Sequence, residues 1–260
     1  MEDLTVELIT IGNELLTGRV VNTNASWIAD RITRLGGIVK RITTVSDEVE
    51  ECSAAIREAL DRKPKLIITT GGLGPTFDDR TLESISIALG LRLKLNQEAL
   101  RMIEEKYGGD VTPPRLKMAR LPEGGKPLSN PVGTAPGCLI EVGATTIIAL
   151  PGVPSEMKAM FELHVEPIVS RLSRTAFIFK TIKVSGIEES SLAPLIDEVM
   201  KKFRSVYVKS RPKRDGELYI EVEVSCRASI KEEAEKEVYE ACRMLKELAS
   251  EVGAKAEDAQ

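Results

Sequence analysis

Apolar positions in the first part of the chain alternate between two periods. Short apolar runs, typical of strands covered on both faces, are separated by segments in which apolar residues recur three and four positions apart, as in amphipathic helices. The predicted strands are residues 5–11, 37–45 and 65–70, followed by a hairpin at 138–142 and 145–150. The predicted helices are residues 23–35, 48–62, 81–89, 96–107 and 155–171. Repeated strand–helix units predict an α/β fold with a three-layer, mostly parallel sheet.

The pattern changes near residue 173. Strands are predicted at residues 177–184, 205–209 and 218–225, with a helix at 190–203 and a long charged helix at 230–252. This order of elements predicts a second, small α+β domain. The predicted division is therefore 1–172 for the first domain and 173–260 for the second.

A basic segment, Lys209 to Gly216, lies between two predicted strands of the second domain. It has neither the aromatic pair of an RNA-recognition motif nor a G-x-x-G clamp, so we predict a solvated hairpin turn and not an RNA contact. The net charge of −4 over 260 residues gives no general reason to expect a nucleic acid or a membrane as partner.

The sequence also indicates the compartment. No apolar run approaches the length of a transmembrane helix, and the acidic start Met1–Leu4 lacks the regions of a signal peptide. The four cysteines are widely spaced, without a C-x-x-C pair, and are expected to be reduced core or interface residues. We therefore expect a cytoplasmic protein. His164 lies in a helical pattern far from any serine or cysteine motif, so its predicted role is structural.

Residues 69–79, Thr-Thr-Gly-Gly-Leu-Gly-Pro-Thr-Phe-Asp-Asp, connect a predicted strand to a predicted helix. A glycine turn between a strand and a helix can bind an anion through backbone N–H groups. The segment is neither a Walker A loop nor a dinucleotide fingerprint, because Pro75-Thr76-Phe77 replaces the residues that those motifs require. The alternative is a purely structural turn in which Asp78 and Asp79 cap the next helix.

Four polar or glycine-rich loops follow or border strands of the predicted parallel sheet. They are residues 12–24, 71–79, 130–137 and 151–156. Because loops at the carboxyl ends of parallel strands converge on one crevice, these loops predict a single ligand site. Each loop taken alone is also explained by ordinary turn chemistry, in which proline and glycine stop a strand and start a helix.

The residue types in these loops suit a phosphate ester. Glycines that allow the backbone to approach phosphate are Gly71, Gly72, Gly74, Gly133, Gly137 and Gly152. Hydroxyl donors are Thr76, Thr134 and Ser155. The carboxylates of Glu14, Asp78 and Asp79 are hard oxygen ligands that suit Mg²⁺ or Mn²⁺. A carboxylate beside a diphosphate is repulsive unless a cation lies between them, so a divalent cation is the predicted cofactor.

Five ordered motifs carry a family resemblance. They are Gly12–Leu16, Asn22–Asn24, Gly71–Thr76 with Asp78 and Asp79, Asn130 with Gly133–Gly137, and Leu150–Met157. Together they resemble the CinA-like proteins, whose main domain has the molybdopterin-binding fold shared with proteins of the MoaB, Mog and MoeA types. The second domain resembles the small KH-like domain of this family, although Glu188 stands where the family has a glycine.

The resemblance implies hydrolysis of a nucleotide diphosphate linkage, such as that of ADP-ribose or FAD, with Mg²⁺, Mn²⁺ or Co²⁺. Asp79 takes the place of a catalytic aspartate in related adenylyl-transferring domains, and Asp78 and Glu14 are expected to help position metal and water. Lys117 falls where the family carries a lysine, which would offset charge on the diphosphate, and Met118 replaces the expected glutamine. The motifs also imply substrate contacts from Asn13, Asn24, Asn130 and Glu156.

Two other functions stay open from the sequence. One is a molybdopterin-binding or adenylyl-transferring protein of molybdenum cofactor biosynthesis, and the other is a noncatalytic nucleotide-binding module. The ligand in each case is a nucleotide or a pterin phosphate, and the family resemblance implies a homodimer. Because the chain ends at Gln260, without the amidohydrolase domain of long CinA proteins, deamidase activity is not expected.

Overall fold

The computed structural model describes residues 3–259, so Met1 and Glu2 of the acidic start and the terminal Gln260 lie outside the described part. The chain forms two compact units, unit 1 at Met1–Ser173 and unit 2 at Arg174–Gln260. The division therefore falls next to the predicted domain boundary.

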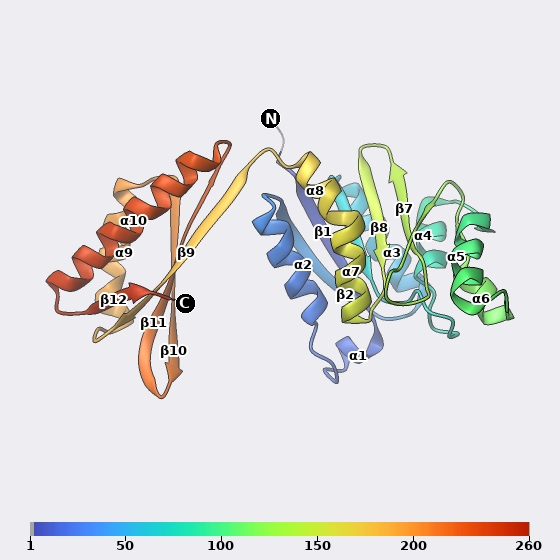
Figure 1. Ribbon diagram of the computed structural model, residues 1–260, viewed down its shortest axis with the longest axis horizontal. Coiled ribbons are helices and arrows are strands. Elements are labelled where there is room, and N and C mark those ends of the chain that lie inside the picture. The colour runs from blue at the N-terminus through green and yellow to red at the C-terminus, as the bar shows by residue number, and fades with distance from the viewer. Residues whose placement is uncertain (1–2, 260) are drawn as a thin grey trace. The chain divides into compact units, whose positions relative to one another are not determined.

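Unit 1 contains a six-stranded sheet in the order β2-β1-β3-β8-β7-β6 (Figure 1). The strands are β1 (Thr5–Ile11), β2 (Ile38–Val45), β3 (Leu66–Thr70), β6 (Lys126–Leu128), β7 (Gly137–Val142) and β8 (Thr145–Leu150). The first four strands in the sheet order are parallel, and β7 runs antiparallel to both of its neighbours, β8 and β6. The prediction of a mostly parallel sheet is thereby confirmed.

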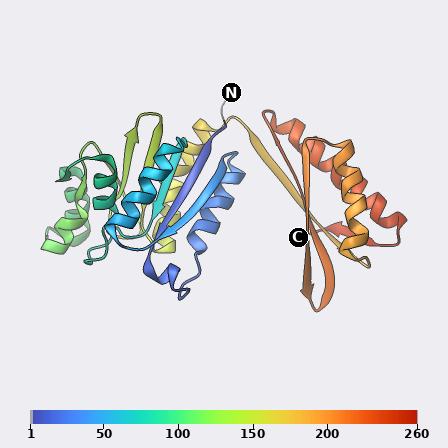
Figure 2. The same ribbon diagram turned by 180° about the vertical axis from the view of Figure 1, so that it is seen from behind.

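Helices cover both faces of this sheet (Figures 1 and 2). One face carries α2 (Thr23–Arg34), α7 (Pro154–Met160) and α8 (Glu166–Leu172), and the other carries α3 (Val49–Asp61), α4 (Thr81–Leu89), α5 (Gln97–Tyr107) and α6 (Pro113–Met118). Alternation along β1 supplies both cores, because Val6 and Leu8 pack on one side and Ile9 and Ile11 on the other. The three layers are as predicted.

The predicted helix at 155–171 is not one regular α-helix. A five-residue π-helical segment, η1 (Phe161–Val165), separates α7 from α8. Pro167 lacks an N–H donor for the preceding turn, which favours such an irregularity. Within η1, Nε2 of His164 lies 2.8 Å from the Ser129 carbonyl oxygen, which joins the helix to the loop after β6.

Several short elements have no counterpart among the predictions. They are α1 (Asn13–Leu16), β4 (Leu93–Leu95), α6, β5 (Arg120–Pro122), β6 and, in unit 2, β12 (Lys255–Asp258). Elements of three to six residues are too short to show a period, which explains why the sequence pattern misses them.

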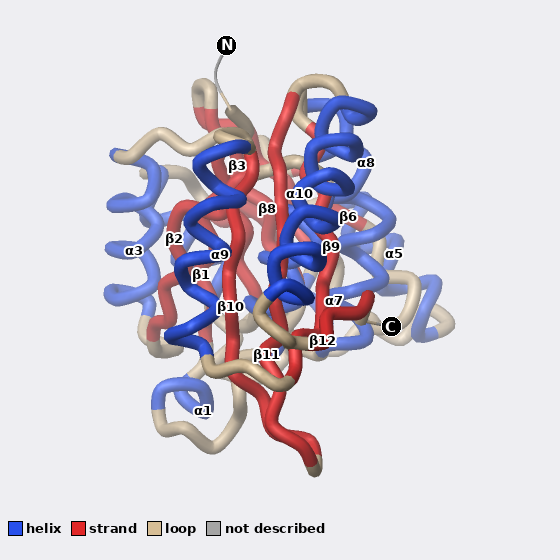
Figure 3. Tube along the Cα trace, turned by 90° about the vertical axis from the view of Figure 1, so that its left-hand side faces the viewer, coloured by secondary structure: helices blue, strands red, loops and turns tan. Residues whose placement is uncertain are grey.

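Unit 2 is a separate α+β unit. Its strands are β9 (Ala176–Ser185), β10 (Val206–Asp215), β11 (Glu217–Ala228) and β12, in the antiparallel order β10-β11-β9-β12. The helices α9 (Glu189–Lys202) and α10 (Lys231–Glu251) cover one face of the sheet (Figure 3). The second α+β domain is therefore confirmed.

The basic segment of unit 2 is different from the prediction. It is not a loop: β10 continues to Asp215, and the turn is formed at Gly216, whose φ is 73°. Proline and dense charge suggested a turn, but an edge strand tolerates both because one of its sides makes no ladder hydrogen bonds.

The four cysteines are free and buried, as predicted for reduced core residues. Burial raises the pKa of the Cys52 thiol to about 11 and that of Cys138 to about 12, so both are protonated at neutral pH. Over the described residues, none of the helices combines the length and the apolar character needed to span a bilayer.

One ion pair stabilises unit 1 from inside the sheet. Glu7 on β1 is only 4% exposed, and its carboxylate accepts hydrogen bonds from Nε and Nη2 of Arg62 at 2.8 and 2.7 Å. Arg62 lies directly after α3, so this pair of hydrogen bonds joins the end of a helix to the central strands. The hydrogen bonds to Glu7 raise the pKa of Arg62.

Replacing Arg62 by Met should lower the free energy of unfolding by about 3 kcal/mol, because it leaves the buried Glu7 carboxylate without its partner. The double variant Glu7→Met with Arg62→Met should recover most of that loss. Urea denaturation of the two variants and of wild type measures both effects. Equal stability of Arg62→Met and wild type would contradict the assignment.

Candidate functional site

The carboxyl ends of β1, β3 and β8 meet because these strands are parallel neighbours. A Cβ atom on Gly71, which has a φ of 102°, would lie 2.3 Å from the Ile11 carbonyl oxygen. A Cβ atom on Gly152 would lie 3.3 Å from the Cα atom of Gly71. Glycine at positions 71 and 152 therefore lets the loops that leave β3 and β8 touch.

A cavity of about 490 Å³ opens at this end of unit 1. Its size is typical of a small-molecule site, and its wall includes residues from all four loops predicted to form the site. Ten of the predicted site residues line it, namely Glu14, Asn24, Gly71, Gly72, Gly74, Asp78, Asp79, Thr134, Gly152 and Glu156.

Seven predicted site residues do not line the cavity: Asn13, Thr76, Lys117, Asn130, Gly133, Gly137 and Ser155. Gly137 is buried in β7, where a Cβ atom would lie 2.6 Å from the Ala149 carbonyl oxygen, so its requirement for glycine comes from sheet packing. Ser155 is exposed in the first turn of α7, outside the wall. The other five residues support the wall from behind or from its edge.

The glycine loop, residues 71–80, is held by Thr81 at the start of α4. The hydroxyl of Thr81 donates to the Gly71 carbonyl at 2.8 Å, and its N–H donates to the Gly72 carbonyl at 3.1 Å. Gly72 has a φ of 65°, and a Cβ atom there would lie 2.3 Å from Oγ1 of Thr81. The alternative in which the aspartates cap α4 is wrong, because its cap is Arg80, which makes no side-chain capping bond.

Thr76 positions the two adjacent aspartates. Its N–H and its hydroxyl donate to Oδ2 of Asp79 at 2.9 and 2.6 Å, and the same hydroxyl also contacts Oδ1 of Asp78. The hydrogen bond from Thr76 is the main reason why the pKa of Asp78 lies below its ordinary value. Thr76 thus holds both carboxylates on one side of the glycine loop.

Lys117 does not face the main cavity, contrary to the role expected of it. Its ammonium donates to the Thr76 carbonyl, and it lines a second cavity of about 100 Å³ that shares Asp79 and the glycine loop. Partial burial lowers the pKa of Lys117, and the nearby Asp79 and Asp78 act in the opposite direction. The lysine therefore supports the backbone that carries the aspartates.

Asn130 organises the opposite part of the wall. Its Oδ1 accepts from the N–H groups of Val132 and Gly133 at 3.1 and 2.7 Å. Its Nδ2 donates to the Ala135 carbonyl at 3.1 Å and to Oε2 of Glu156 at 2.7 Å. With four hydrogen bonds this buried amide is fully satisfied, so it positions Glu156 and has no bond left for a ligand.

Asp47, Tyr107 and Met118 also line the cavity, although they lie outside the four predicted loops and were not among the predicted site residues. Asp47 follows β2 and accepts from the Asn13 N–H at 2.9 Å, which fixes the start of α1 beside the cavity. It obeys the same rule as the predicted loops, since it stands at the carboxyl end of a parallel strand. Tyr107 comes from the end of α5, and no local sequence signal marks it.

The described residues contain no cluster of three or more His, Cys, Asp or Glu side chains arranged to hold a metal. Glu14 therefore does not join the two aspartates in a preformed ligand set, although all three line the cavity. Asp78 and Asp79 alone fit a cation such as Mg²⁺, which proteins often bind with one or two carboxylates while phosphate oxygens and water complete the coordination.

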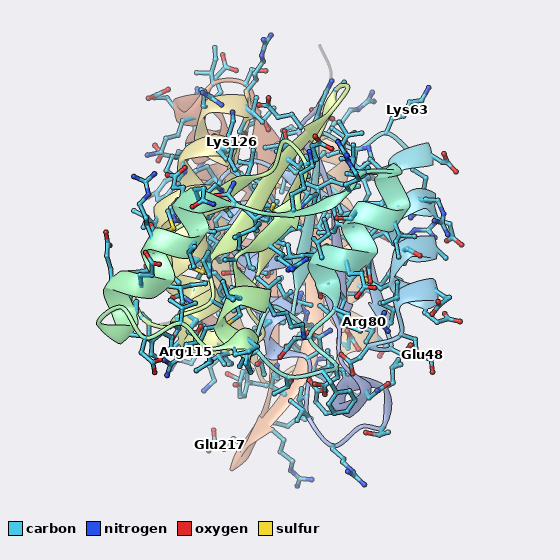
Figure 4. All side chains as sticks on the ribbon, turned by 90° about the vertical axis from the view of Figure 1, so that its right-hand side faces the viewer. Glu48, Lys63, Arg80, Arg115, Lys126 and Glu217 are labelled. Carbon is cyan, nitrogen blue, oxygen red and sulfur yellow. The ribbon has the colours of Figure 1, made fainter. Side chains whose placement is uncertain are left out.

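The cavity wall is strongly acidic. Its carboxylates are Glu14, Asp47, Asp78, Asp79 and Glu156, and no Lys, Arg or His of the described chain lines it. Arg80 and Arg115 lie toward the same end of unit 1, opposite Lys63 and Lys126 (Figure 4). Arg80 is paired with Glu83 at 2.8 Å and Arg115 with Asp110 at 2.7 Å, so their charges are already balanced by neighbours.

Comparison with known proteins gives a consistent set of matches. A family model described as "probable molybdopterin binding domain" matches residues 7–171, most of unit 1. A protein of Aeropyrum pernix is 44% identical over 252 residues, which cover 95% of this chain and 94% of the relative. A protein of Pyrobaculum arsenaticum is 47% identical over 247 residues, 93% of each chain.

A solved structure also resembles unit 1. The crystal structure of the protein CinA, of unknown function, from Thermoplasma acidophilum is 46% identical, with a TM-score of 0.61. The match covers 64% of this chain and 98% of that one.

Replacing Gly72 by Ala should destabilise unit 1 more than replacing Gly90 by Ala. Both glycines have a φ of 65°, so each substitution costs about 1–2 kcal/mol of backbone strain. Only at position 72 does the new methyl group also collide with Thr81, whereas Gly90 has open space around it. Chemical denaturation measures the free energy of unfolding of each variant, and equal losses would contradict the close contact between Gly72 and Thr81.

Proposed function

Because the chain belongs to the family of the molybdopterin binding domain and is a CinA-like protein, we propose that unit 1 binds a phosphate ester and hydrolyses a nucleotide diphosphate linkage. The proposed substrates are of the ADP-ribose or FAD type, and the proposed cofactor is a divalent cation, Mg²⁺, Mn²⁺ or Co²⁺. The proposal is supported by the chemistry of the cavity wall.

The observation that carries the proposal is the pair Asp78 and Asp79 beside the glycine loop, in a cavity without a lining cation. A glycine loop before a helix offers backbone N–H groups to phosphate. Two carboxylates at the same place would repel a diphosphate, and no side-chain cation of the described wall offsets that repulsion. A site of this kind suits a ligand that arrives with its own divalent cation.

Each of several residues would perform one part of the proposed hydrolysis. Asp78 and Asp79 would hold the cation, which when bound neutralises charge on the phosphate oxygens. The glycine loop would orient the diphosphate, Thr76 keeps both carboxylates in place, and Asp79 would orient the attacking water and accept its proton. The water oxygen bonds to one phosphorus while the bridging oxygen leaves with the other phosphate, giving AMP and ribose 5-phosphate from ADP-ribose.

A second function is favoured by the family description itself. A molybdopterin-binding protein would place the phosphate of the pterin on the same glycine loop, with or without transfer of an adenylyl group. ATP consumption that requires the pterin would support this candidate, and nucleotide binding without any turnover would support a noncatalytic module. AMP release from ADP-ribose or FAD on addition of Mg²⁺, Mn²⁺ or Co²⁺ supports the hydrolase.

Asp79→Asn should lower the rate of AMP release from ADP-ribose with Mn²⁺ by about a hundredfold or more, because the carboxylate that accepts the proton is lost. Asp61→Asn, at the exposed end of α3, is the matched control and should keep full activity. Circular dichroism shows whether each variant is folded. A folded Asp79→Asn protein with wild-type turnover would exclude this mechanism.

Thr76→Val should move the acid limb of the pH–rate profile to higher pH. The Thr76 hydroxyl holds the pKa of Asp78 below its ordinary value, so wild type keeps this carboxylate ionised to a lower pH than the variant. As pH falls, protonation therefore removes the cation ligand earlier in Thr76→Val. Thr76→Ser, which retains a hydroxyl, should restore the wild-type limb, and an unmoved limb in the valine variant would refute the assignment.

A further inference from the structure

Asn24 presents a buried acceptor with no partner. Its Nδ2 donates to the Gly152 carbonyl at 2.7 Å, which fixes the orientation of the amide, since a flip would place two oxygens face to face. Its Oδ1 is buried and makes no hydrogen bond with any described residue. An unsatisfied buried acceptor costs about 1–3 kcal/mol, so its place in the cavity wall suggests that a ligand satisfies it.

Glu156 provides a second hydrogen-bond acceptor that lacks a partner. Asn130 must direct its Nδ2 to Glu156, because two backbone N–H groups occupy its Oδ1. Oε2 of Glu156 therefore accepts from the protein, while Oε1 has no hydrogen bond within the described structure. Gly133 leaves room for this arrangement, because a Cβ atom there would lie 2.0 Å from Oε2.

Both acceptors belong to the part of the wall around the loop from β8 to α7. Asn24 bonds to the carbonyl of Gly152, and Glu156 lies in the first turn of α7, which begins two residues after Gly152. No lysine, arginine or histidine of the described chain lines the cavity, so this acceptor wall, Asn24 and Glu156, has no side-chain cation for a phosphate. It suits hydrogen-bond donors instead.

The geometry points to the acceptor wall as the element that selects a donor-bearing part of the ligand, either the vicinal hydroxyls of a ribose or the amino group of a heterocycle. The inference rests on the proposed function, which places the phosphates on the glycine loop. It adds a division of the cavity: phosphate and cation beside Asp78 and Asp79, and a neutral group rich in O–H or N–H donors against Asn24 and Glu156. Asn130 is a positioning residue for Glu156.

The test is the binding of nucleoside monophosphates to the full chain with Mn²⁺, measured by calorimetry. AMP is compared with 2′,3′-dideoxy-AMP, which lacks the ribose hydroxyls, and with purine riboside monophosphate, which lacks the amino group. Wild type should bind one of these analogues at least about tenfold more weakly than AMP, because a hydrogen bond to a carboxylate is lost. The analogue that weakens binding identifies the donor.

Glu156→Gln is the decisive variant, because it preserves an oxygen for Asn130 but replaces the second acceptor by an NH₂ donor. It should bind AMP at least about tenfold more weakly and lose the discrimination between AMP and the selected analogue. Asn130→Asp should also lose discrimination, since a carboxylate would repel Glu156. Glu162→Gln, exposed in η1 and outside the cavity, should behave as wild type.

Three outcomes would overturn the inference. In the first, wild type binds both analogues as tightly as AMP. In the second, folded Glu156→Gln binds all three ligands more weakly by the same factor and keeps the discrimination. In the third, K⁺ or Ca²⁺ strengthens wild-type binding of all three ligands and Glu156→Gln abolishes that effect, which would assign the wall to a cation. If AMP is released from ADP-ribose while discrimination is absent, only this inference fails. Absence of any nucleotide binding refutes the proposed function as well.

Discussion

The site depends on how closely three strand ends approach one another. Gly71 lies against the Ile11 carbonyl at the end of β1, and Gly152 lies against Gly71, so the backbones of three consecutive sheet neighbours come together without side chains between them. Parallel pairing alone would align the strands, but a methyl group at position 71 would separate their ends. The cavity is thus built first from backbone, and the functional side chains are arranged around it.

The acidity of that cavity restricts what it can hold. Five carboxylates without a lining cation would repel a bare phosphate, so the anionic and the neutral parts of a ligand need different places. The structure provides two distinct settings: the two aspartates held by Thr76 and supported through Lys117, and the amide and carboxylate acceptors around α7. Asn130 uses all four of its hydrogen bonds within the protein and contributes to the second setting by holding Glu156 in place.

Much of this arrangement follows from the sequence, because the strand and helix periods of unit 1 are long and the loops follow strands in a regular order. Asp47 also follows a parallel strand and obeys the same rule, but no glycine beside it marks that position as part of a site. The role of Lys117 was not accessible, because spacing along the chain does not show on which side of the glycine loop its ammonium lies. The place of Tyr107 in the wall could not be predicted either, because only tertiary packing brings the end of α5 there.

Strand β10 forms one edge of the sheet of unit 2, and its composition has a consequence for the behaviour of the chain in concentrated solution. Pro212 removes one N–H from that edge, and Lys209, Arg211 and Lys213 stand exposed along it. A second strand that joined this edge would have to dehydrate and crowd like charges, which makes sheet-to-sheet polymerisation unfavourable. The same basic residues that resemble a recognition loop thus keep a long, otherwise regular edge strand from seeding aggregates.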